Sequence, residues 1–164
     1  MISTTLVIVM VALAILLVGV RVVGLTPYTV LSGSMVPAYP VGSLIYVKQV
    51  DAADIEVGTP LTFKVSGGAM VATHRVVEVI TDNGETLYVT KGDANDMPDP
   101  PVRYGSVIGT PVFSIPFLGY FSTWLQSGAG VIAGIALAAM LLLSLLLSEV
   151  LPREEEPTQP LENP

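Results

Sequence analysis

The chain has 164 residues, of which 51% are hydrophobic and 13% charged, and its formal net charge is −7. An average soluble domain carries roughly 25% charged residues, so this composition favours a membrane-associated protein with one modest domain. The acidic balance lacks a basic patch that would neutralise phosphates, so we expect no nucleic-acid partner. The sequence has no cysteine and one histidine, which excludes disulfides and predicts neither a metal site nor a cofactor.

Residues 2–23 are predicted to form an N-terminal transmembrane helix. Leu6–Val20 contains no charged residue, and its apolar flanks extend it to the length of about 20 residues that a spanning helix needs. A cleaved signal peptide is the alternative, and it requires a basic start and a small-x-small cleavage site. The start, Met-Ile-Ser-Thr-Thr, has no basic residue, which favours a retained anchor.

Residues 28–122 are rich in Val, Thr, Gly and Pro, which is typical of short strands separated by turns. We find no helix pattern between the two apolar ends of the chain. The expected fold class is therefore a membrane-anchored, mostly-β protein, with a small antiparallel, barrel-like domain between two transmembrane helices. The predicted strands are Leu44–Val47, Leu61–Val65, Met70–Ile80 and Leu87–Lys91.

The pair Asn83-Gly84 favours a two-residue type I′ hairpin between the last two predicted strands. Counting back from that turn in equal steps along both strands places His74 opposite Asp93 on the same face. A slip of one residue would turn the two side chains to opposite faces.

Residues 129–148 are predicted to form a second transmembrane helix, because they are uncharged and rich in strong helix formers. Gly130 and Gly134 have the spacing that lets a neighbouring helix approach closely. Arg153 favours a cytoplasmic C-terminus, which places the central domain outside the cell, although Arg21 argues weakly for the reverse. Residues 152–164 are acidic and proline-rich, and we expect them to form a disordered tail.

Three groups of residues carry the chemistry that nucleophilic acyl transfer needs, namely a serine, a base and a carboxylate. Ser34 follows the first apolar segment, within the sequence Ser-Gly-Ser-Met-Val-Pro that begins at Ser32. His74 has the one side chain whose ordinary pKa suits a general base near neutral pH. An ordinary loop serine, a buried core histidine and a lysine base are the alternative interpretations.

A loop with three aspartates, Asp93, Asp96 and Asp99, supplies the carboxylates. A solvated acidic loop and a calcium site are the alternatives, but the loop lacks the alternating oxygen ligands and the later Gly and Glu of a calcium-binding loop. The serine segment also lacks the Gly-x-Ser-x-Gly pattern of an α/β-hydrolase.

Taken together, these segments resemble the type I signal peptidase family, in its archaeal and endoplasmic-reticulum branch, which has similar members in some Gram-positive bacteria. The resemblance covers about residues 5–125 and depends on several motifs in the same order. Besides the N-terminal anchor, these are Leu31–Pro37, His74–Val77, Thr90–Asp93 with the aspartates that follow, and Ile115–Gly119.

The resemblance implies that Ser34 is the nucleophile and that His74 is the general base, in the place of a lysine in the bacterial branch. It implies that Asp99 orients the histidine, with Asp93 as a supporting carboxylate, whereas the hairpin count favours Asp93. The Ser32 hydroxyl and the Ser34 N–H would then form the oxyanion hole.

The implied activity is that of a membrane-bound serine endopeptidase, which cleaves signal peptides from secretory preproteins after small residues at positions −3 and −1. An extended substrate would add as a strand to the sheet edge. The implied partners are preproteins, the lipid bilayer and secretion machinery. The implied location is the cell membrane, multi-pass, with the catalytic domain on the extracytoplasmic side. A non-catalytic membrane scaffold or assembly subunit, and a serine protease that cuts other membrane proteins, are the alternatives.

Overall fold

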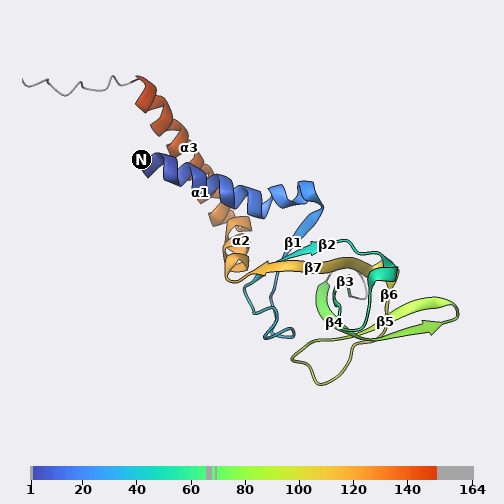
Figure 1. Ribbon diagram of the computed structural model, residues 1–164. Coiled ribbons are helices and arrows are strands. Elements are labelled where there is room, and N and C mark those ends of the chain that lie inside the picture. The colour runs from blue at the N-terminus through green and yellow to red at the C-terminus, as the bar shows by residue number, and fades with distance from the viewer. Residues whose placement is uncertain (1, 66–67, 69, 151–164) are drawn as a thin grey trace, which may run out of the picture.

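The computed structural model describes residues 2–65, 68 and 70–150. A seven-stranded sheet occupies the middle of the chain, in the order β1-β2-β7-β3-β4-β5-β6, and each neighbouring pair is antiparallel (Figure 1). The strands are β1 (Leu25–Thr29), β2 (Leu44–Lys48), β3 (Pro60–Lys64), β4 (Val71–Asp82), β5 (Glu85–Lys91), β6 (Val102–Arg103) and β7 (Val107–Ile115).

Three α-helices flank this sheet in sequence, namely α1 (Ile2–Leu17), α2 (Leu118–Gln126) and α3 (Gly128–Val150). Short 3₁₀ segments lie at Gly19–Val23, Ala52–Asp54 and Tyr104–Ser106. The prediction of a mostly antiparallel β domain is confirmed. The prediction of no helix between the apolar ends is wrong, because α2 begins at Leu118 and connects the sheet to α3.

The four predicted strands correspond to β2, β3, β4 and β5, whereas β1, β6 and β7 were not predicted. Strand β7 contains Gly109 and Pro111, residue types that are depleted in strands. The structure explains Gly109 by a close backbone approach, since a Cβ atom there would collide with the carbonyl oxygen of Lys48. The register of the β2–β7 and β3–β7 pairs shifts in this part of the sheet.

The β4–β5 hairpin has the predicted turn, with positive φ angles of 50° at Asn83 and 82° at Gly84. The pairing runs in equal steps from this turn until Glu78 faces Val89, but the next pair joins Val76 to Thr90. One extra residue, Val77, therefore forms a β-bulge in β4. The prediction that His74 lies opposite Asp93 is wrong, because the bulge shifts the rest of the hairpin by one residue.

Two clusters of buried side chains hold the sheet together. One joins β3, β4 and β5 through Leu61, Val76 and Tyr88, with Ile55 packed against them. The other joins the first 3₁₀ segment to β2 through Val20, Leu44 and Tyr46. One cluster thus packs the sheet against the end of the N-terminal helical segment, and the other packs β3, β4 and β5 together.

The apolar helices α1 and α3 lie against one another and extend away from the strands (Figure 1). In the described residues, no single helix combines the length and apolarity needed to cross a membrane. By length and composition, α2 and residues 128–140 of α3 meet the criterion only as a pair, bent by 90°. The predicted tail, 152–164, lies outside the described residues.

Gly130 and Gly134 both lie at the contact between α2 and α3. A Cβ atom at Gly130 would collide with the carbonyl oxygen of Trp124, and one at Gly134 would lie 3.7 Å from a methyl group of Leu125. The close approach of the two helices therefore requires a glycine at position 130, whereas a methyl group at position 134 would make an ordinary contact with α2.

Replacing Leu61 by alanine should destabilise the domain, because its fully buried side chain lies in the β3–β4–β5 core. We expect the free energy of unfolding to fall by about 2–5 kcal/mol. Leu31→Ala is the matched control, since that leucine is 80% exposed, and it should change the free energy little. Denaturant unfolding in detergent measures both variants, and equal losses would contradict the assignment of the core.

Candidate active site

The loop between β1 and β2 carries Ser34, and backbone hydrogen bonds tie it to the sheet. The amide of Val30 donates to the carbonyl of Ser43, and the amide of Gly42 donates to the carbonyl of Val30, both at 2.9 Å. The side chain of Met35 is buried beside the serine. The loop that carries Ser34 is therefore held to the sheet at both of its ends.

A second connection holds Ser34 from the loop that follows β5. The amide of Ala94 donates to the carbonyl oxygen of Ser34 at 2.9 Å. The two backbones come so close that a Cβ atom at Gly92 would lie 2.6 Å from the same carbonyl oxygen. The glycine of the Thr-Lys-Gly-Asp motif is thus required for the approach of the aspartate loop to the serine.

His74 lies on β4 with its side chain 13% exposed, and it contacts both predicted partners. Its Nε2 atom is 3.1 Å from Ser34 Oγ, and its Nδ1 atom is 2.6 Å from Asp99 Oδ2. The ring of Phe63 packs edge-on against the imidazole, with ring centroids 6.2 Å apart. The structure thus brings Ser34, His74 and Asp99 into one connected chain of hydrogen bonds.

Asp99 is held from β5 by Thr90. The Thr90 hydroxyl donates to Asp99 Oδ2 at 2.8 Å, and the Asp99 amide donates to the Thr90 carbonyl at 2.7 Å. The carboxylate therefore accepts hydrogen bonds from a fixed side chain as well as facing the imidazole of His74. Three separate segments, the β1–β2 loop, β4 and the loop after β5, supply the serine, the histidine and the carboxylate.

Asp93 has another partner, Arg75. The guanidinium donates from Nε and Nη2 to the two carboxylate oxygens, at 2.8 and 2.7 Å, and from Nη1 to the carbonyl of Gly58 at 2.8 Å. These bonds from Arg75 hold the pKa of Asp93 below its ordinary value, although burial acts in the opposite direction. The same pairing raises the pKa of Arg75. Asp93 therefore does not bind the imidazole, and the expected contact with His74 is replaced by an ion pair.

The remaining predicted residues are placed as follows. Ser32 Oγ is 3.2 Å from Ser34 Oγ, so the two hydroxyls lie side by side. Asp96 is exposed. Arg75 and Thr90 lie in the motifs that begin at His74 and at Thr90, but the sequence predicts no role for either residue. The positive charge of Arg75, next to His74 in sequence, indicates that an acidic partner lies nearby. No sequence pattern indicates that the Thr90 hydroxyl is buried at the site.

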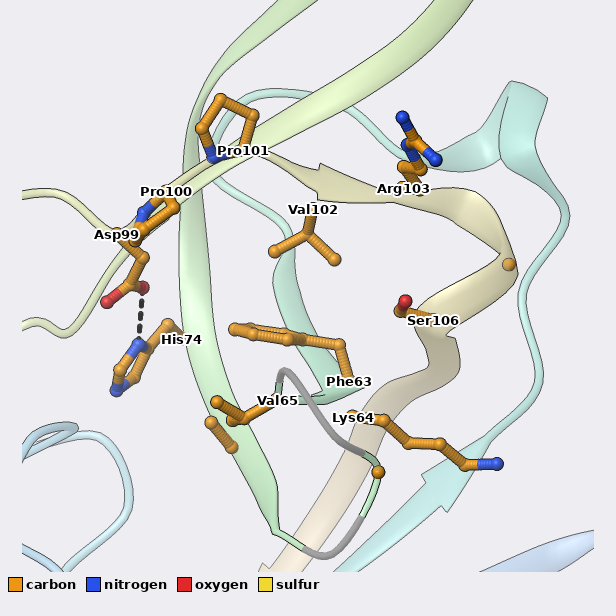
Figure 2. A pocket seen from close by; sticks show the side chains of 13 residues that line it. Phe63, Lys64, Val65, His74, Asp99, Pro100, Pro101, Val102, Arg103 and Ser106 are labelled. Atoms are coloured by element: carbon orange, nitrogen blue, oxygen red, sulfur yellow. Dashed lines mark hydrogen bonds and ion pairs between the residues drawn. The ribbon is translucent and has the colours of Figure 1, made fainter.

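Two hollows flank His74. Figure 2 shows the first, of about 590 Å³, with His74 and Asp99 on one side and Phe63 and Val102 near its centre. The second, of about 530 Å³, contains both Ser34 and His74. Because a substrate must reach the serine and the histidine together, the second hollow is the reaction site candidate. Its apolar lining includes Leu31, Met35, Ile45, Val71 and Ala72.

The edge of β4 borders this second hollow. Strand β4 pairs with β3 from Val71 onward but with β5 only from Arg75 onward. Among the described residues, the β5 side of residues 71–74 therefore has no neighbouring strand. Such an edge offers backbone donors and acceptors to an extended peptide.

The geometry suits nucleophilic chemistry. The two hydrogen bonds of the imidazole fall in the range of about 2.6–3.2 Å that couples a nucleophile to its base and the base to its orienting group. A proton on Nδ1 facing Asp99 leaves Nε2 as the acceptor for the Ser34 hydroxyl. Within residues 2–65, 68 and 70–150, no three acidic or histidine side chains gather as a metal site would require.

A serine, a histidine and an aspartate joined by successive hydrogen bonds define the class of site found in serine hydrolases. Here the three residues are positioned by an antiparallel sheet. No protein-family profile matches the chain. Curated proteins do match, including signal peptidase I W of Bacillus subtilis, which is 40% identical over 79 residues, or 48% of this chain and 41% of that protein. The human signal peptidase complex catalytic subunit SEC11C is 41% identical over 71 residues, or 43% of this chain and 37% of that protein.

A longer match is to the signal peptidase complex catalytic subunit SEC11 of Lachancea thermotolerans, which is 31% identical over 127 residues. That match covers 68% of this chain and 75% of the relative. The chain belongs to the type I signal peptidase family. The matches to the Bacillus and human proteins span about two fifths of those proteins' lengths.

Replacing Asp93 by asparagine should remove a pH-dependent contribution to stability. The pKa of Asp93 is depressed in the folded state. The ion pair therefore contributes its full stabilisation above the ordinary pKa of an aspartate, about 3.9. This stabilisation is lost as the pH falls through the lower pKa of the folded state. The difference in free energy of unfolding between the wild type and Asp93→Asn should therefore be larger at pH 7 than at pH 3. Denaturant unfolding at both pH values measures it, with Asp96→Asn as the control. A difference that is independent of pH would contradict this assignment.

Proposed function

We propose that this protein is a membrane-bound serine endopeptidase that removes N-terminal signal peptides from secreted preproteins. The observation that carries the proposal is the unbroken chain from Ser34 Oγ through His74 to Asp99. The imidazole has a carboxylate on Nδ1 and a serine hydroxyl on Nε2, which is the arrangement that activates a serine as a nucleophile. Family membership supplies the substrate class, since the matched relatives are named signal peptidases.

In the proposed reaction, Ser34 Oγ attacks the scissile carbonyl while His74 Nε2 accepts the hydroxyl proton. The imidazolium then gives that proton to the leaving amine, and a water repeats the sequence to release the acyl group from the serine. Asp99 accepts the Nδ1 hydrogen bond throughout and stabilises the positive charge on the imidazole. The distances of 3.1 and 2.6 Å on the two ring nitrogens support these roles.

The proposed oxyanion hole consists of the Ser32 hydroxyl and the Ser34 N–H. The 3.2 Å separation of the Ser32 and Ser34 hydroxyls supports the first donor, because the oxyanion forms on the carbon that Ser34 Oγ attacks and therefore develops close to the Ser32 hydroxyl. Asp93 takes a supporting role through Arg75. Their ion pair fixes the start of the loop whose Ala94 amide holds the Ser34 carbonyl.

We propose that the substrate binds as an extended strand along residues 71–74 of β4, with its side chains in the hollow that contains Ser34. Small residues at substrate positions −3 and −1 suit this hollow, because it must hold the peptide backbone and still admit two side chains. The apolar side chains of Leu31, Met35 and Ile45 line it, so small apolar residues are favoured over charged ones.

The membrane arrangement is also a proposal. Residues 2–23 and 129–148 would span the bilayer, and residues 28–122 would form the catalytic domain on the extracytoplasmic side, so that the protein is a multi-pass protein of the cell membrane. The two apolar helices α1 and α3 contact each other and carry large exposed apolar side chains, which a lipid environment would cover. The bilayer, secretory preproteins and secretion machinery are then the partners.

Cleavage of a labelled preprotein by membranes that carry the chain tests the proposed activity. Ser34→Ala and His74→Ala should each lower the rate by a factor on the order of a thousand or more, because each removes one member of the catalytic unit. Ser114→Ala, which alters a serine on β7, is the matched control and should cleave at the wild-type rate. Product should appear at a small-x-small site. Equal rates for all four proteins would leave the non-catalytic scaffold as the function.

Alkaline carbonate extraction of the same membranes tests the anchoring. The full chain should remain in the membrane pellet, because spanning helices resist extraction whereas peripheral proteins are released. A protease added to intact cells should digest the 28–122 domain and leave membrane-protected fragments. Release of the chain by carbonate, or protection of the domain in intact cells, would contradict the arrangement.

A further inference from the structure

The side chain of Thr90 is fully buried and contacts the proposed catalytic unit through Asp99. Its hydroxyl donates to the same carboxylate oxygen, Asp99 Oδ2, that faces Nδ1 of His74. Its carbonyl accepts the amide of Asp99. Thr90 therefore holds Asp99 at both the backbone and the carboxylate.

The bulge at Val77 is the reason why Thr90 and His74 lie on the same face of the hairpin. In β5, Thr90 lies on the same side as the buried Tyr88. Without the extra residue Thr90 would face Val77, and His74 would lie on the opposite face of the hairpin. With the bulge, Thr90 faces Val76, which is 1% exposed, on the same side of β4 as His74. The extra residue in β4 thus leaves the direction of Thr90 unchanged and brings His74 to the face on which Thr90 lies.

A carboxylate on a loop needs such a contact, because its side chain can rotate and present either oxygen, or neither, to the imidazole. Asp99 remains 25% exposed, so water competes for its lone pairs. A buried donor on Oδ2 selects the rotamer in which that oxygen faces Nδ1, and the Nδ1–H tautomer of His74 follows from it.

We propose that Thr90 is a positioning residue, which fixes the Asp99 carboxylate in the orientation that keeps His74 ready to accept the proton of Ser34. This inference rests on the proposed function for its kinetic consequence but not for its structural one. Thr90 touches neither the substrate nor the reacting atoms, and it acts through Asp99.

Kinetics of the full-length protein in detergent test the proposal with two substitutions. Thr90→Val keeps the shape and removes the donor, so kcat should fall by about 10- to 100-fold with little change in KM. Thr90→Ser restores the hydroxyl and should recover most of the wild-type kcat. Thr110→Val is the matched control, since it removes a threonine hydroxyl bond of equal length, 2.8 Å, to the carbonyl of Pro60 on β3. A wild-type kcat in Thr90→Val would overturn the proposal.

A double-mutant cycle separates positioning from a general loss of structure. In an Asp99→Asn background, measured with enzyme in excess over substrate, Thr90→Val should have little further effect if Thr90 acts through Asp99. A structural defect would lower the rate by the same factor in both backgrounds, and that result would overturn the proposal. The cycle remains informative even if Thr90→Val lowers the thermal stability.

The single histidine of the chain gives a readout that needs no substrate. Nitrogen-15 spectra of the imidazole in micelles should show the Nδ1–H tautomer in the wild type and in Thr90→Ser, and a shift toward the other tautomer in Thr90→Val. An unchanged tautomer in Thr90→Val would overturn the positioning role. If the wild type cleaves no preprotein but the tautomer shifts as expected, the proposed function fails and the positioning role stands.

Discussion

The register of the β4–β5 hairpin is the constraint on which the rest of the site depends. Side chains alternate between the two faces of a strand, so one residue more or less exchanges every inward position for an outward one. The bulge at Val77 makes this exchange within a single hairpin. On the turn side of the bulge the pairing follows the Asn83-Gly84 turn, and beyond it His74 and Thr90 share the face that carries the site.

The arrangement of charges follows from the same register. Arg75 and Asp93 are the neighbours of His74 and Gly92 in sequence, and they pair with one another near the surface. Asp93 is therefore already neutralised by a guanidinium, which makes it a poor partner for an imidazolium. Asp99 has no such cation among its described contacts and accepts its bonds from a threonine and the histidine. Two aspartates in one loop thus have different partners, because one of them pairs with an arginine.

Sequence patterns predicted those parts of the fold that depend on local rules. The hairpin turn follows from the preference of Asn-Gly for positive φ angles, and β2 to β5 follow from short apolar or alternating runs bounded by turn residues. The resemblance, not the strand count, pointed to Asp99, which the structure places beside His74. The bulge at Val77 was not predictable, because the flanking valines look alike in sequence and only tertiary packing decides which of them faces inward.

The missed elements share a second cause. Strands β1 and β7 contain Pro27, Gly109 and Pro111, which oppose strand formation locally. Gly109 is explained only by the backbone of Lys48, a residue far away in sequence that lies too close for any side chain. Helix α2 was missed for a related reason, since its apolar residues resemble strand residues and its start depends on the packing of Gly119 against the backbone of Gly42 and Ser43.

The short chain segment between the N-terminal helical segment and Ser34 limits the distance between the candidate site and that segment. Strand β1 begins at Leu25, directly after the 3₁₀ segment that ends at Val23, and the loop with Ser34 follows this strand. Even fully extended, the residues from Gly24 to Ser34 reach only about 40 Å, and the pairing of β1 with β2 fixes their path. Ser34 is therefore tied at a short distance to the apolar N-terminal segment. If that segment lies in a bilayer, the hollow at Ser34 lies near the membrane surface, where the apolar part of a signal peptide ends and its cleavage site begins.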